Sequence, residues 1–272
     1  MTVAPETPEA PTAQHGSAPT LETRGVTKSF GSVQALTDVD FEVCSGEVMA
    51  LVGDNGAGKS TLIKCIAGIH PIDGGQILWD GEPVTIHGPK DTARLGIEVV
   101  YQDLALADNL DVVQNMFLGR EETYGALSQL DETSMEQRAS ETLKSLSVTT
   151  LSSVRQTVAG LSGGQRQSVA VAKAVMWNSK LVILDEPTAA LGVAQTRQVL
   201  DLVKRLGEQG LAVVLISHNL HDIFEVADSI TVLRLGKDVA RFTTKDTNQQ
   251  EVVQAITAGS MARVPGQDGE PA

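Results

Sequence analysis

The sequence predicts an α/β fold with a mainly parallel core sheet, an antiparallel β subdomain and an inserted helical subdomain. Three observations support this prediction. Short continuous apolar runs at 47–52, 181–184 and 212–216 are typical of parallel strands that helices cover on both faces. Residues 23–43 alternate between apolar and polar, which indicates two antiparallel strands. Between 102 and 180 the period becomes helical, without a convincing strand.

The other elements follow from the same patterns. Turn residues interrupt the strand pairs, and each apolar run of the core is followed by a helical segment. The N-terminal residues 1–20 are rich in Pro, Ala, Thr and Glu, lack the apolar run of a secretory signal and are expected to be a disordered tail. Residues 259–272 form a polar C-terminal tail. The expected strands are 76–79, 97–101 and a hairpin at 229–242, and the expected helices are 60–67, 132–146, 164–177, 193–208 and 249–256.

Composition limits the classes of function. The chain has 272 residues, of which 42% are hydrophobic and 20% charged, so it resembles an ordinary globular protein. No window reaches the roughly 18 consecutive apolar residues of a membrane-spanning helix. The formal charge of -13 argues against nucleic acid as a partner, because surfaces that bind phosphate backbones are usually basic. The two cysteines, Cys44 and Cys65, are too few for a disulfide framework and are expected to be buried thiols in a reducing cytosol.

A glycine-rich loop follows the first apolar run of the core. Residues 53–60 match the pattern G-x-x-x-x-G-K-[ST] and lie between a buried strand and a helix, which is the setting that phosphate binding requires. Gly56 and Gly58 let the backbone curl inward, Lys59 reaches the β and γ phosphates, and Ser60 can ligate Mg²⁺. The predicted nucleotide contacts in this loop are Gly53, Asp54, Asn55, Gly56, Ala57, Gly58, Lys59, Ser60 and Thr61.

Two adjacent acids, Asp185 and Glu186, end the apolar run 181–184. A carboxylate at the C-terminal end of a parallel strand can face bound phosphates through Mg²⁺, so Asp185 is an expected metal ligand. Glu186 is then placed to accept a proton from the water that attacks the γ-phosphate. Adjacent acids at a strand end usually form only a solvated turn, but the presence of the phosphate loop favours the functional interpretation here.

A third motif, Leu161-Ser162-Gly163-Gly164-Gln165, opens a helix with Ser162 as a candidate N-cap. Alone, it could be just a glycine-containing cap. It lies between the phosphate loop and the acidic pair, and Ile216-Ser217-His218 follows later in the chain. In this order the motifs resemble those of ABC-type ATPases, a class of P-loop NTPase. The resemblance covers nearly all of residues 21–258, and the LSGGQ segment (161–165) is its most specific part.

The resemblance implies a nucleotide-binding domain over 21–258, with a helical subdomain at about 103–180. It also implies that the protein binds ATP with Mg²⁺ and hydrolyses ATP. In such ATPases two copies associate head to tail, so that Ser162, Gly163, Gly164 and Gln165 of one copy complete the ATP site begun by the phosphate loop of the other. A two-fold axis makes this arrangement geometrically ordinary for a homodimer.

Three further residues gain roles from the resemblance. Gln102 corresponds to a glutamine that touches Mg²⁺, His218 to a histidine that contacts the γ-phosphate, and Phe30 to an aromatic residue that stacks on adenine. Each also has an ordinary interpretation, as a solvated loop residue, a structural hydrogen bonder and a packing residue respectively. The other histidines, His15, His70, His87 and His221, show no metal-ligand spacing and are interpreted as surface or structural residues.

Residues 101–110 and 115–121, together with 186–192, resemble the carbohydrate-importer branch of ABC ATPases. The implied partners are membrane permease subunits and, indirectly, a sugar-binding protein, which places the chain at the cytoplasmic face of the membrane. Most members of this branch fuse two nucleotide domains, whereas 272 residues hold one. Gly192 also departs from the aspartate that many ABC ATPases carry there.

Two rival interpretations remain. The first is an ABC ATPase outside sugar import, either a translation or DNA-repair type or a transporter of another substrate. Repair ATPases insert a long heptad coiled coil between phosphate loop and LSGGQ segment, and no sustained heptads occur here. Translation factors carry tandem domains joined by a charged linker. The second is a purely regulatory binding subunit, against which the intact Glu186 argues.

Overall fold

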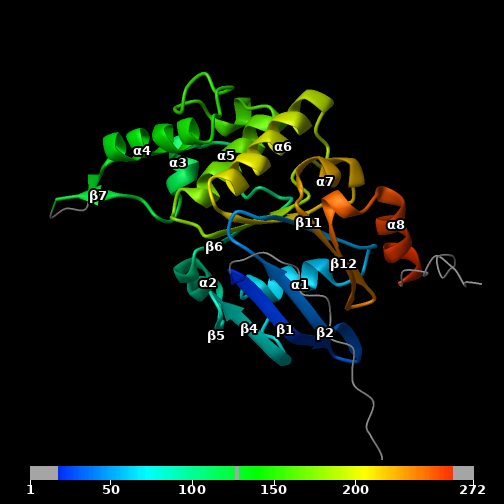
Figure 1. Cartoon of the computed structure of the whole chain (residues 1–272). Helices are drawn as coiled ribbons and strands as arrows, with labels where there is room; N and C mark the ends of the chain where they lie inside the picture. Colours follow the sequence, from blue (N-terminus) through cyan, green and yellow to red (C-terminus); the bar gives the residue numbers. More distant parts are fainter. Residues whose placement is uncertain (1–17, 126–128, 260–272) are drawn as a thin grey trace, which may run out of the picture.

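The computed structural model describes residues 18–125 and 129–259. The tails predicted at 1–20 and 259–272 therefore lie almost wholly outside the described residues. The described residues contain two large sheets, a layer of helices and a two-stranded hairpin (Figure 1).

The central sheet has six strands in the order β12-β11-β3-β10-β9-β6. Its inner strands pair in parallel, and β12 joins one edge antiparallel to β11. The predicted mainly parallel sheet is therefore confirmed. The strand bounds are β3 (Val48–Val52), β6 (Ile97–Val100), β9 (Leu181–Asp185), β10 (Ala212–Ile216), β11 (Ser229–Arg234) and β12 (Lys237–Thr243).

Both faces of this sheet are buried, which explains the continuous apolar runs in the sequence. In β3, Val48, Ala50 and Val52 pack into one hydrophobic cluster, whereas Met49 and Leu51 pack into the other. Successive side chains of a strand point to opposite faces, so a strand covered on both sides needs apolar residues at every position.

One face is covered by helices that lie above the sheet in Figure 1. The predicted helical segments are all confirmed to within two residues at each end. Two shorter helices, α3 and α7, and the two-residue strands of the hairpin β7-β8 were not predicted from the sequence. The bounds are α3 (Val112–Phe117), β7 (Thr123–Tyr124), β8 (Gln129–Leu130), α4 (Glu132–Ser145), a 3-10 helix (Val158–Gly160), α5 (Gly163–Val175), α6 (Val193–Glu208), α7 (Leu220–Val226), a 3-10 helix (Thr244–Asp246) and α8 (Gln249–Ala258).

The other face packs against α1 and the antiparallel sheet, whose order is β2-β1-β4-β5. Leu62 and Ile63 of α1 are buried between the two sheets. The two strands predicted in 23–43 are confirmed as β1 and β2. The bounds are β1 (Leu21–Phe30), β2 (Val33–Val43), α1 (Lys59–Ile66), β4 (Gly74–Trp79), β5 (Glu82–Val84) and α2 (Pro89–Leu95).

Both cysteines are buried, as expected, and burial raises the pKa of each thiol to about 11. Within residues 18–125 and 129–259, no helix combines the length and apolar character that crossing a membrane requires.

Candidate active site

The C-terminal ends of neighbouring strands bring the predicted site residues to one edge of the central sheet. In the register of β10, Ile216 lies opposite Leu51 of β3 on one side and Asp185 of β9 on the other. The phosphate loop, His218 and Glu186 each follow directly after these aligned positions. Gln102 follows β6, which pairs with β9 on its outer side. The sheet therefore assembles residues that are far apart in sequence, as strand ends in α/β proteins do.

The phosphate loop runs so close to other backbone that its glycines are required. Gly53 has a φ of 151°, and a Cβ there would lie 2.2 Å from the carbonyl oxygen of Leu233 in β11. Gly58 has a φ of 108°, and a Cβ there would lie 3.0 Å from the carbonyl oxygen of Ala35 in β2. The loop is therefore held between both sheets, in a backbone conformation that L side chains rarely adopt.

Helix α1 begins at Lys59 with no side-chain hydrogen bond at its N-cap, Gly58. The first amides of a helix lack partners within the helix and form a site of positive potential that suits an anion. The ammonium of Lys59 donates to the carbonyl oxygens of Gly53 (2.7 Å) and Asp54 (3.1 Å), so it lies across the loop. Burial lowers the pKa of Lys59, and the negative charges of nearby acids, Glu186 first, oppose that shift.

The carboxyl group of Asp185 lies in an unfavourable environment for a charge. Burial, and next the negative charge of Glu186, raise its pKa, whereas Lys59 and Lys64 act in the opposite direction. Asp185 and burial also raise the pKa of Tyr101, with burial the larger cause. A partly buried carboxylate with this repulsion is the kind of group that a bound cation stabilises.

Glu186 and His218 lie in direct contact. Nδ1 of His218 is 2.8 Å from Oε2 of Glu186, and the imidazole is 79% exposed whereas the glutamate side chain is 18% exposed. Glu186 has a φ of 51° and donates its amide to the carbonyl oxygen of Ile216 (2.9 Å). A non-glycine residue in this region costs about 1 to 3 kcal/mol, and such residues concentrate at functional sites.

The oxygen ligands available at this sheet edge fit Mg²⁺. No cluster of three or more acids, histidines or cysteines that could hold a metal occurs among the described residues. Mg²⁺ is commonly bound by one or two protein oxygens, with waters and substrate phosphates in its other positions. Asp185, the Ser60 hydroxyl and the Gln102 amide oxygen are groups that would supply that chemistry.

Gln102 is exposed, and the loop that follows it is held in place by a residue whose role the sequence did not reveal. Asn115 of α3 is completely buried. Its side-chain oxygen accepts from the amide of Ala107 (2.7 Å), and its side-chain nitrogen lies 3.0 to 3.3 Å from the carbonyl oxygens of Ala107, Leu110 and Asp111. The available signal was a pair of adjacent polar side chains, Gln114 and Asn115, in an otherwise apolar helix.

The LSGGQ segment begins α5, and Ser162 is its N-cap as predicted. Ser162 and Gln165 form a reciprocal capping box, and Gln165 also donates to the carbonyl oxygen of Thr150 (2.6 Å). Gly163 and Gly164 pack against Leu191 and Gln195. Among the described residues, the hydrogen bonds of Ser162 and Gln165 do not reach the phosphate loop. The described hydrogen bonds of Ser162 and Gln165 stay at the start of α5 and with the backbone of Thr150.

Phe30 ends β1, and its side chain is 45% exposed. The ordinary interpretation of this residue was core packing, and a ring this exposed instead leaves room for a ligand. The phosphate loop contacts the neighbouring strand β2 through Gly58, Ala35 and Leu36. The hairpin that carries Phe30 is therefore attached to the predicted phosphate site.

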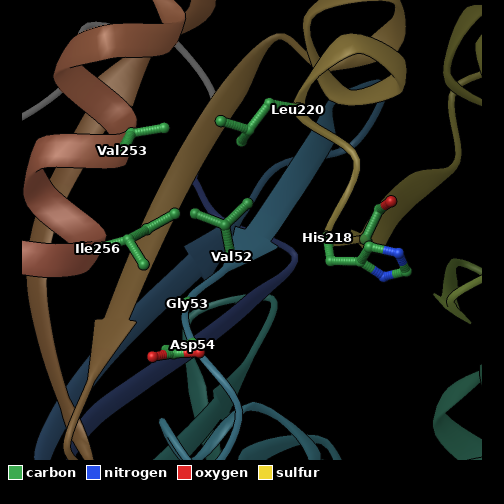
Figure 2. Close-up of a pocket in the computed structure, with 8 residues that line it drawn as sticks. Val52, Gly53, Asp54, His218, Leu220, Val253 and Ile256 are labelled. Atoms are coloured by element: carbon green, nitrogen blue, oxygen red, sulfur yellow. The ribbon is translucent and has the colours of Figure 1, made fainter.

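A hollow of about 210 Å³ lies beside the phosphate loop (Figure 2). Gly53, Asp54 and His218 form its polar side, and residues of β3, α7 and α8 form its apolar side. In Figure 2, Val253 and Ile256 extend from α8 towards Val52 and Leu220. Of the predicted site residues, Gly53, Asp54 and His218 line this hollow, whereas Lys59, Asp185 and Glu186 do not.

A parallel sheet with a phosphate loop at the end of one strand (β3) and an acidic pair at the end of another (β9), with β10 between them, defines a P-loop nucleotide-binding protein. Residues 36–189, more than half of the chain, match the model of the ABC transporter family. The chain belongs to this family, as an ATP-binding subunit that hydrolyses ATP.

Curated relatives agree over most of the chain. It is 45% identical to the fructose import ATP-binding protein FrcA of Rhizobium meliloti, over 88% of this chain and 94% of the relative. It is also 45% identical to the xylose/arabinose import ATP-binding protein XylG of Sulfolobus acidocaldarius, over 90% and 96%. The ribose import ATP-binding protein RbsA of Yersinia pestis is 42% identical over 88% of this chain, which spans only 46% of that relative.

Solved structures show the same fold. The ADP conformation of MJ1267, an ATP-binding cassette of an ABC transporter, has a TM-score of 0.75 at 26% identity and covers 88% of this chain and 95% of its own. A dimeric post-hydrolysis state of the cassette MJ0796, bound to ADP and Pi, has a TM-score of 0.68 at 26% identity over 82% and 98%. The predicted fold class is confirmed.

Proposed function

We propose that this chain powers the import of a monosaccharide, through ATP hydrolysis beneath membrane permease subunits that receive the sugar from a binding protein. The observation that carries the proposal is the contact between Glu186 and His218 at the strand ends beside the phosphate loop. The printed names of the relatives supply the substrate class, because fructose, xylose, arabinose and ribose are all small sugars.

In the proposed reaction, the phosphate loop and the N-terminus of α1 hold the triphosphate, and Lys59 leaves its two carbonyl partners to contact the β and γ phosphates. Glu186 accepts a proton from the attacking water, and His218 orients the γ-phosphate. Ser60, Asp185 and Gln102 would hold Mg²⁺, which would supply neutralising charge for the phosphates.

Two copies complete the reaction site in this proposal. The LSGGQ segment of one copy meets the phosphate loop of the other, so that each dimer holds two ATP sites. The position of Ser162 at an exposed helix start, away from the strand-end cluster of its own copy, supports a role towards a second chain. Binding ATP then promotes association, and hydrolysis promotes separation. The dimer sits at the cytoplasmic face of the membrane, against the permease surface.

The test is sugar uptake in a strain that lacks the gene. Uptake of labelled fructose, xylose, arabinose and ribose is measured one at a time. Uptake of at least one sugar should be lower in the deletion strain and should be restored when the unaltered chain is expressed. Glu186→Gln should fail to restore uptake, since loss of a general base lowers turnover about 10²- to 10⁴-fold, while the purified variant still binds ATP. Lys59→Ala should lose ATP binding.

Lys90→Ala provides the matched control, because Lys90 is an exposed lysine on α2. It should restore uptake fully at the same expression level. Unchanged uptake of every sugar in the deletion strain would show that the cargo is not one of these sugars. Normal ATP turnover by purified Glu186→Gln would show that another group is the base.

A further inference from the structure

An apolar corner surrounds the end of β1. Phe30 lies opposite Val33 in the register of β1 and β2, and the two residues are 45% and 64% exposed. Ile69, which precedes His70, is also 45% exposed. Exposed apolar side chains that lie together can form a binding surface, and a flat aromatic ligand is one kind of group that such a corner can accept.

His70 contacts Phe30 with edge-to-face geometry. The ring centroids are 5.1 Å apart and the planes meet at 75°, which is a favourable arrangement for an aromatic pair. The amides of Ile69 and His70 both donate to the carbonyl oxygen of Lys64 in α1, at 2.8 and 3.1 Å. Helix α1 therefore carries Lys59 of the phosphate loop at one end and His70 just beyond the other.

A second contact holds the same ring from β1. Asp73 accepts from the ammonium of Lys28 and from the amide of Ser29, both at 2.7 Å, and these hydrogen bonds lower the pKa of Asp73. The side chain of Lys28 is only 9% exposed, and its ammonium lies 5.6 Å from the Phe30 ring centroid. The segment after α1 thus fixes the end of β1 at two points.

We propose that His70 is a positioning residue that holds the Phe30 ring for stacking on the adenine of ATP. The inference rests on the proposed ATP site. It adds that α1, through His70, sets the position of the Phe30 ring relative to the phosphate loop. A ring held in place before binding loses less conformational freedom when adenine stacks on it. The sequence had given His70 only a surface or structural role.

The test compares two ligands that share the phosphates and differ in the base. Dissociation constants for ATP and for inorganic tripolyphosphate, each with Mg²⁺, are measured on the full chain carrying Glu186→Gln so that ATP is not consumed. Adding His70→Ala should raise the dissociation constant for ATP about three- to tenfold, which corresponds to the energy of one aromatic pair. The dissociation constant for tripolyphosphate should not change. His70→Phe keeps an aromatic edge and should retain most of the ATP affinity.

The controls distinguish a failure of the proposed role of His70 from a failure of the proposed ATP site. His87→Ala removes an exposed imidazole near α2 and should change neither dissociation constant. Asp73→Asn should weaken the binding of ATP but not that of tripolyphosphate. This variant keeps the inference testable if His70→Ala does not fold. Equal effects of His70→Ala on both ligands, or no effect on either, would overturn the role of His70. If instead the proposed ATP site were wrong, adding Lys59→Ala to the Glu186→Gln chain would leave the dissociation constants for both ligands unchanged.

Discussion

At the scale of single residues, the site combines groups that are costly in the nucleotide-free chain. Glu186 has a strained backbone, and burial and the negative charge of Glu186 raise the pKa of Asp185. Both features are expected if these residues serve a reaction rather than stability, as we propose. The sequence was sufficient to predict both acids, because they follow directly after a continuous apolar run.

Asp185→Asn should make the nucleotide-free chain more stable at pH 7. The pKa of Asp185 in the folded state is raised above its value in the unfolded chain, so the folded state binds more protons between the two values. Stability from this group is present below the unfolded pKa of 3.8 and is lost as the pH rises through the folded pKa. Urea unfolding at several pH values should give Asp185→Asn a higher free energy of unfolding than the unaltered chain, and this difference should shrink as the pH falls.

The same variant should lose Mg²⁺-dependent ATP turnover. An isosteric amide keeps the packing of β9 but removes the negative charge that favours a divalent cation. Lower stability of Asp185→Asn than of the unaltered chain at pH 7, without nucleotide, would contradict the electrostatic account of this residue.

At the scale of elements, the loop after Gln102 is tied to two helices. Asn115 holds it to α3, and Asp108 pairs with Arg166 of α5 at 2.9 Å. The backbone of the loop also pairs with the segment that precedes the LSGGQ segment, through the amides of Val158 and Ala159. Contacts that reach Gln102 are therefore connected structurally to the start of α5.

Asn115→Ala should destabilise the protein by about 2 to 4 kcal/mol, because it removes the hydrogen bonds of a completely buried side chain and leaves the amide of Ala107 without its acceptor. Urea unfolding monitored by circular dichroism measures the change. Asn109→Ala is the matched control, since Asn109 is an exposed asparagine of the same loop and its removal should change stability by less than about 0.5 kcal/mol. Equal effects of the two substitutions would contradict a structural role for the Asn115 hydrogen bonds.

Elements differed in how far the sequence predicted them. Long periodic helices such as α6 were placed at their observed bounds, because burial of one face imposes a repeat over several turns. Helix α3 is too short to show that repeat, although its capping box at Asp111 and Gln114 was a readable start signal. The role of His70 depends on Phe30, which is distant in sequence, so no local pattern indicated it. The partners of Asn115 are only 4 to 8 residues away, but they lie in a loop whose conformation no periodic pattern predicts.

At the scale of the whole molecule, the central claim is that one chain holds only half of each ATP site. The strand-end cluster contains the phosphate loop, Glu186 and His218, whereas the LSGGQ segment begins a helix elsewhere. In the head-to-tail dimer that we propose, a symmetric pair of chains would join the two halves twice, which would give a closed assembly without further copies. The sequence order of the motifs allowed this expectation, but the fold of one chain was needed to locate both halves.

Crosslinking of two cysteine variants tests this claim most directly. Asn55→Cys and Ser162→Cys, both at exposed positions, are introduced into separate chains that carry Glu186→Gln, and the chains are mixed with a short bismaleimide. The native thiols should not interfere, because Cys44 and Cys65 are buried and the pKa of each is about 11. With ATP and Mg²⁺, crosslinks should join position 55 of one chain to position 162 of the other, and chains with the same substitution should not crosslink to each other. Crosslinking that favours like positions, or that is unaffected by ATP, would contradict the head-to-tail arrangement.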